Sequence, residues 1–105
     1  MELQSIKILN RKEKGETHMT KKEVRATIEE KIADRLEFAK MNWNTWLHLP
    51  EETEEEKATA DVYNRWAEED KVRGYELIDL LEAFGFIGAE EALKRKSEFY
   101  SQMIE

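Results

Sequence analysis

Two opposite charges each interrupt a stripe of apolar side chains on one face of a predicted helix. Arg35 falls within one helical stripe and Asp70 within another, and a chain reversal near Pro50 places them at similar heights. A buried carboxylate without a partner is costly, so each charge needs the other. We therefore expect an Arg35–Asp70 pair that fixes the register of two helices. The functional alternative is a buried charged site that lines a pocket.

Carboxylates also recur at helical spacing in two places. Glu52 and Glu55 have the spacing Glu-x-x-Glu, and Glu76 and Asp79 have the spacing Glu-x-x-Asp. This arrangement resembles the magnesium motif of the all-helical nucleotide pyrophosphohydrolases, the MazG-like group. The resemblance implies that these four carboxylates hold Mg²⁺, which binds the phosphates of the substrate. If both motifs lie on one continuous helix, however, they cannot converge.

The acidic run 51–56 has a second interpretation as the first turn of a helix, where carboxylates complement the positive end of the helix dipole. Metal sites for hard cations need oxygens that converge from several chain segments. The sequence offers no Ser–His–Asp arrangement and no glycine loop that would cradle a phosphate. We assign no catalytic residue, and a cofactor is expected only under the magnesium alternative.

Aromatic and amide side chains are concentrated just before the proline. Trp43 and Trp46 share the main apolar stripe and are expected to face the core. Other side chains nearby point away from that stripe or carry free amides, which makes them candidates for a protein interface. These interface candidates are Phe38, Met41, Asn42 and Asn44.

Three helices are needed to position these residues. The first is predicted from about Lys21 to His48, because Thr20 and Glu23 form a capping box and Pro50 disfavours helical geometry at Leu49. The second begins between Glu51 and Glu54, with a capping box at Thr53 and Glu56, and ends at Phe84 before a left-handed Gly85. The third spans Ala89 to Ile104.

The second helix carries an apolar stripe made of large side chains, with one glycine inside it. The expected core residues are Tyr63, Trp66, Leu77, Leu81 and Phe84. Gly74 costs up to about 1 kcal/mol relative to alanine in a helix. It marks a close helix approach, a kink, or a division into two helices.

These elements predict an all-α fold, a small three-helix bundle built on a long antiparallel helical hairpin. Residues 19–105 form the bundle domain, while residues 1–18 are a flexible or non-native N-terminal extension. The segment before Met19 has no sustained helical period. Met19 is a candidate natural start, because codons for Lys14, Gly15 and Glu16 can contain a bacterial ribosome-binding sequence.

Composition narrows the function classes. The chain has 105 residues, a net charge of −7 and no cysteine, which excludes disulfides and thiolate chemistry. The acidic balance disfavours nucleic acid, and no apolar run is long enough for a membrane span. We expect a cytoplasmic, non-catalytic interaction protein whose partner has a basic surface. It would be a phage or mobile-element accessory protein that binds or inhibits a host protein, with self-association as a further option.

Overall fold

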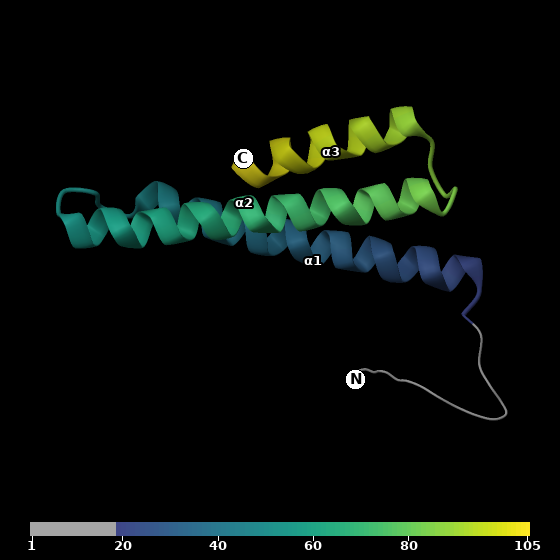
Figure 1. The fold of residues 1–105 in the computed structure, drawn as a ribbon, viewed down its shortest axis with the longest axis horizontal. Coiled ribbons are helices and arrows are strands. Elements are labelled where there is room, and N and C mark those ends of the chain that lie inside the picture. The colour runs from purple at the N-terminus through teal and green to yellow at the C-terminus, as the bar shows by residue number, and fades with distance from the viewer. Residues whose placement is uncertain (1–18) are drawn as a thin grey trace, which may run out of the picture.

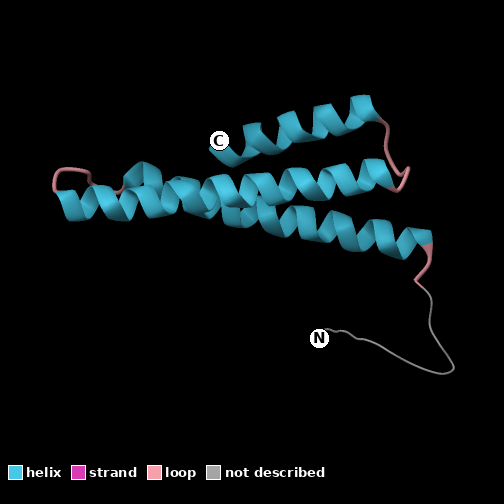
Figure 2. Cartoon of the chain, in the orientation of Figure 1, coloured by secondary structure: helices cyan, strands magenta, loops and turns pink. Residues whose placement is uncertain are grey.

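The computed structural model describes residues 19–105 and contains three helices in that range, with no strand among the described residues. The helices are α1 (Lys21–His48), α2 (Glu54–Ala83) and α3 (Ala89–Ile104) (Figure 2). The predicted all-α, three-helix arrangement is confirmed. The expectations for residues 1–18, including their assignment as an extension, lie outside the described residues.

Reciprocal side-chain caps set the starts of α1 and α2. The Thr20 hydroxyl accepts from the Glu23 backbone N–H at 3.1 Å, and the Thr20 N–H donates to Glu23 Oε1 at 2.8 Å. Thr53 and Glu56 repeat the arrangement, with both of their distances 3.1 Å. Each box satisfies backbone donors that a helix N-terminus leaves without partners. Both predicted capping boxes are confirmed.

The helix ends follow from local backbone chemistry. Leu49, which precedes Pro50, is extended with φ −81° and ψ 139°, so α1 ends at His48. After α2, Gly85 adopts φ 82°. The Gly85 N–H donates to the carbonyl of Glu82 and the Phe86 N–H to that of Leu81, both at 2.9 Å. This is a Schellman termination, for which glycine is the favoured residue.

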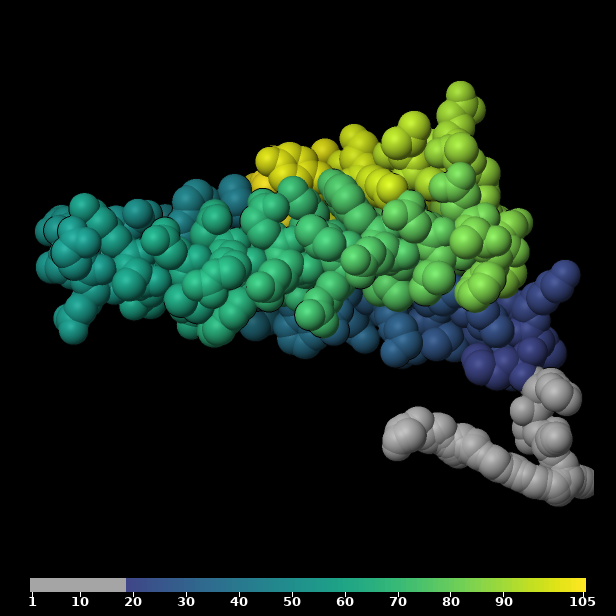
Figure 3. Space-filling view, viewed as in Figure 1, coloured from purple at the N-terminus to yellow at the C-terminus, as the bar shows by residue number. Residues whose placement is uncertain are grey.

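The chain reverses direction around Pro50, so that α1 and α2 lie side by side as a helical hairpin, while α3 lies along the second half of α2 (Figure 1). With 30 residues, α2 is about 45 Å long, whereas the 16 residues of α3 reach only about 24 Å. Among the described residues, the end of the hairpin near Pro50 therefore consists of α1, α2 and the loop between them (Figure 3).

The hydrophobic core lies where all three helices meet. Its buried members are Ile28, Ile32, Ala39, Ile78, Leu81, Ala92, Phe99 and Met103. Gly74 is buried beneath the Phe99 ring, and a Cβ at position 74 would lie 2.5 Å from two ring carbons. Because α2 continues without a break through Gly74, this glycine serves a close helix approach rather than dividing the helix.

The predicted core stripe of α2 is wrong in part. Trp66 is 44% exposed and Phe84 is 57% exposed, while the small residues Ala60 and Ala67 are fully buried. Ala60, Ala67, Gly74 and Leu81 recur every seven residues and are all buried. Small side chains leave room for a neighbouring helix, as Gly74 does for the Phe99 ring of α3. Trp66 and Phe84 therefore lie outside the buried stripe of α2.

Candidate interaction surface

A three-residue polar cluster joins α1 to α2 at the middle of the hairpin. Asp70 is 8% exposed. Its Oδ1 accepts from Arg35 Nη1 at 3.0 Å, and its Oδ2 accepts from Asn42 Nδ2 at 3.0 Å. Both carboxylate oxygens are thus bonded to donors that come from α1. The structure brings Arg35 and Asp70 together and adds Asn42 to them.

The sequence analysis did not assign Asn42 to this cluster. It placed Asn42 among the interface candidates, but the side chain is half-buried and its amide group donates to Asp70. The signal was present in the spacing. Asn42 follows Arg35 by seven residues, two helical turns, so both side chains lie on the same face of α1.

The Arg35 side chain also borders a groove between α1 and α2. Its guanidinium carbon lies 5.8 Å from the centre of the Phe38 ring, a cation–π arrangement. Within the groove, Phe38 is 49% exposed and Leu80 is 41% exposed, while Leu77 is half-buried. We call the groove-lining residues the open face: Lys31, Asp34, Arg35, Phe38, Arg73, Glu76, Leu77 and Leu80.

The open face lies on the side of the hairpin away from α3. On α1, Glu29 binds Arg95 of α3, and Phe38 follows Glu29 by nine residues, two and a half turns. On α2, the ammonium of Lys71 lies 5.4 Å from the Tyr100 ring of α3, and Leu80 follows Lys71 by nine residues. Half a turn separates the two sides in both cases. Helix α3 therefore covers one side, and no other helix of residues 19–105 covers the opposite side.

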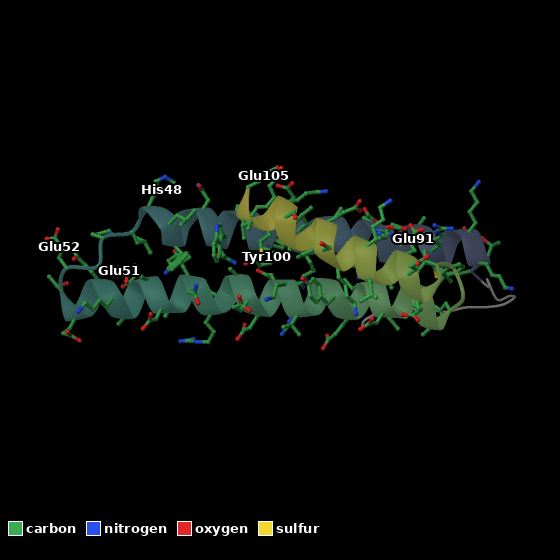
Figure 4. All side chains as sticks on the ribbon, turned by 90° about the horizontal axis from the view of Figure 1, so that it is seen from above. His48, Glu51, Glu52, Glu91, Tyr100 and Glu105 are labelled. Atoms are coloured by element: carbon green, nitrogen blue, oxygen red, sulfur yellow. The ribbon has the colours of Figure 1, made fainter. Side chains whose placement is uncertain are left out.

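Figure 4 looks onto the side that α3 covers. Tyr100 lies over the middle of the hairpin, whereas His48, Glu51 and Glu52 lie at its end, beyond α3. Trp43 and Trp46 are half-buried near that end, with ring centres 4.8 Å apart. The two tryptophans thus pack on each other, and Trp43 also packs against the core cluster.

The remaining interface candidates lie outside the groove. Met41 is 60% exposed, and Asn44 is exposed. The backbone carbonyl of Asn44 lies 2.8 Å from His48 Nδ1, a contact within the last turns of α1. Of the four candidates, the structure places Phe38 in the groove and Asn42 in the polar cluster.

The structure does not bring the four carboxylates of the magnesium alternative together. Glu52 and Glu55 lie at the start of α2, and Glu76 and Asp79 lie toward its other end. The 21 residues from Glu55 to Glu76 correspond to about 30 Å of helix. Asp79 instead binds Lys96 Nζ at 2.7 Å. Among residues 19–105, no three His, Cys, Asp or Glu residues are grouped closely enough to hold a metal ion.

A bidentate ion pair attaches α3 to α1. Arg95 Nη1 donates to Glu29 Oε2 at 2.8 Å, and Nη2 donates to Oε1 at 2.6 Å. The hydrogen bonds from Arg95 hold the pKa of Glu29 below its usual range, and the same bonds raise the pKa of Arg95. This pair holds the helix that covers the opposite side of the hairpin from the open face.

Sequence reasoning assigned no role to Arg73 and Leu80, and it gave Leu77 to the core and Glu76 to the magnesium alternative. Arg73, Leu77 and Leu80 follow the i, i+4, i+7 spacing of a helix face, a signal that could have found them.

Comparison of the chain with protein-family models, curated proteins and solved structures gives no match. In the described part of the chain, no helix has both the length and the apolar content to cross a membrane.

Proposed function

We propose that this protein is a small, non-catalytic interaction module and that the open face is its contact surface. The observation that carries the proposal is the exposure of Phe38 and Leu80 beside Leu77 in a groove flanked by charged side chains. Exposed apolar groups rimmed by polar ones are typical of protein interfaces. Binding to this face would let the protein regulate or inhibit its partner, as expected of an accessory protein.

The charges of the open face refine the expected partner. Lys31, Arg35 and Arg73 stand beside Asp34 and Glu76, so the face itself carries both signs. A partner surface that is only basic would complement the acidic remainder of the molecule better than this groove. The partner that fits the groove presents apolar side chains and charges of both signs.

Site-specific photo-crosslinking in cells tests the contact surface. A photoreactive amino acid at position 38 should capture a protein, because Phe38 is part of the open face. Leu93 is the matched control, since it is apolar, 68% exposed and located on α3. Equal capture at positions 38 and 93, or capture at neither, would contradict the proposal.

Thermal melting separates this proposal from the magnesium alternative. A ligand that binds the native state raises its melting temperature once the ligand concentration exceeds the dissociation constant. We expect Mg²⁺ with nucleoside triphosphates to leave the melting temperature unchanged. A specific shift that is lost in Glu76→Gln would favour the hydrolase.

A further inference from the structure

We infer that α3 opens from the hairpin as a unit, and that the side it uncovers is a groove for an amphipathic helix. This side is distinct from the open face, so its role is independent of the proposed function. Three features support the inference: the way α3 is held, the shape of the surface beneath it, and the contacts that α1 and α2 make without it.

Helix α3 is held by a single row of side chains. Three residues of the row are buried, and two others form ion pairs, one with α1 and one with α2. These five residues are Ala92, Arg95, Lys96, Phe99 and Met103. Their spacing of i, i+3, i+4, i+7 and i+11 is that of a helix that docks by one face into a groove.

The connection to α2 leaves α3 free to move once this row is released. Phe86 and Ile87 of the link pack against the core, whereas Gly88 does not, because a Cβ there would meet no other atom within 4 Å. Gly88 is also the N-cap of α3 and provides no side-chain cap, unlike the threonines before α1 and α2. Gly88 is therefore the hinge, and α3 depends on packing for its stability.

The surface beneath α3 is shaped to receive a helix. Gly74 forms its floor, where a Cβ would lie 2.5 Å from two carbons of the Phe99 ring. Glu29 on α1 and Asp79 on α2 provide carboxylates for the two basic residues of α3. Its apolar surface comes from the core residues Ile28, Ile32, Ile78 and Leu81. Opening of α3 therefore uncovers an apolar groove with one carboxylate from each helix of the hairpin.

The hairpin has contacts that do not involve α3. Both carboxylate oxygens of Asp70 bind donors on α1. Ala60 is fully buried, although it precedes Lys71, the α2 residue beside Tyr100 of α3, by 11 residues, about 16 Å of helix. In that region α1 is the neighbouring helix (Figure 1). These contacts persist when α3 leaves, so opening of α3 disrupts less of the structure than global unfolding does.

Hydrogen exchange of the full chain, read by mass spectrometry, tests the opening. Peptides from residues 89–104 should share one exchange rate, at least about tenfold faster than the buried turns of α1 and α2. Gly74→Ala should raise the α3 rate by at least about another tenfold, because the added Cβ meets the Phe99 ring. Alanine also favours the helix of α2, so the exchange of α1 and α2 should stay within about twofold of wild type.

Leu93→Ala is the matched control, since Leu93 lies on α3 and is 68% exposed. It should leave the exchange of all three helices unchanged. If α3 exchanges at the rate of α1 and α2 in the wild type, or if Gly74→Ala accelerates all three helices together, the helices open as one unit and the inference is wrong.

Binding of a labelled peptide, followed by fluorescence anisotropy, tests the groove. The probe is a synthetic peptide of residues 89–105, which needs no structure of its own because the groove orders it on binding. In the full-length Glu29→Arg chain, Arg95 of α3 faces a second cation, so α3 should leave the groove more often. A peptide with Arg95→Glu restores the opposite charges, and it should bind this chain at least about tenfold more tightly than the unchanged peptide does.

The wild-type chain should bind both peptides more weakly than this matched pair, because its own tethered α3 competes at a high effective concentration. Circular dichroism establishes that each chain is folded. If Glu29→Arg is not folded, Asp79→Lys with a Lys96→Glu peptide provides the equivalent pair. Equal binding of the two peptides by a folded variant, or binding of neither, would overturn the groove.

Discussion

The two sides of the α1–α2 hairpin are built from the same two helices but differ in what packs against them. On one side α3 completes the packing, with Phe99 seated on Gly74 and Arg95 bound to Glu29. On the other, Asp70 fixes the two helices to each other, and Phe38 and Leu80 remain exposed. The difference teaches that two interactions are independent in this fold: the alignment of α1 with α2, and the packing of a third helix on the hairpin. Within residues 19–105, the polar cluster fixes α1 against α2, and α3 covers one side of the hairpin.

Removing a ring from each side should give the largest contrast. Phe99→Ala should destabilise the protein by about 3–5 kcal/mol, because Phe99 is 3% exposed and α3 packs through it. Phe38→Ala should cost about 1 kcal/mol or less in the monomer, since the ring is already half in solvent. Chemical denaturation at low protein concentration measures both. Similar losses for the two variants would show that the sides do not differ in the way described.

Disrupting the polar cluster should have an intermediate effect. Asp70→Ala leaves Asn42 and part of Arg35 without their acceptor, which should cost about 2 kcal/mol. The 36% exposure of the Arg35 side chain keeps this cost below that of a fully buried pair. Replacing both Arg35 and Asp70 with leucine should recover much of the loss. A double-mutant cycle with near-zero coupling would argue against an energetic role for the pair.

The helix boundaries were predictable because local chemistry determines them. The threonine caps, the proline and the left-handed Gly85 act within a few residues of their own position, so one sequence contains the whole signal. Opposite charges within apolar stripes also identified Arg35 and Asp70 as partners. In that case the high cost of burying a charge without a partner left few other arrangements for the two side chains.

The core of α2 and the open face were less predictable, because both depend on which helix packs where. The stripe of large side chains suggested Trp66 and Phe84 for the core, but close packing favoured the alanines and Gly74. The open face depends on where α3 lies and how far it reaches. Periodicity within a helix reveals a face, yet it does not reveal which face another helix will cover.

A comparison of tryptophans tests this revision of the core. Trp43 packs against the core and against Trp46, so Trp43→Ala should cost about 3 kcal/mol. Trp66 is 44% exposed and stacks edge-on to Tyr63, so Trp66→Ala should cost about 1 kcal/mol in the monomer. Thermal melts at low concentration measure the difference. Equal and large losses would return Trp66 to the core of the single chain.

The smallest expected effect is a pH dependence on the side covered by α3. Arg95 lowers the pKa of Glu29, so the folded state favours the ionised carboxylate more than the unfolded state does. This contribution to stability is fully present above about pH 5 and is lost as the pH falls through the lowered pKa. The reason is that the unfolded state takes up a proton at Glu29 more readily than the folded state does. The melting-temperature gap between wild type and Glu29→Gln should therefore be largest near neutral pH and should close in acid. Glu37→Gln is the matched control, since Glu37 is an exposed glutamate of the same helix, and its gap should stay small throughout. A gap for Glu29→Gln that fails to shrink, or widens, as the medium is acidified would contradict the assignment, because the Arg95 bond would then not depend on the charge of Glu29.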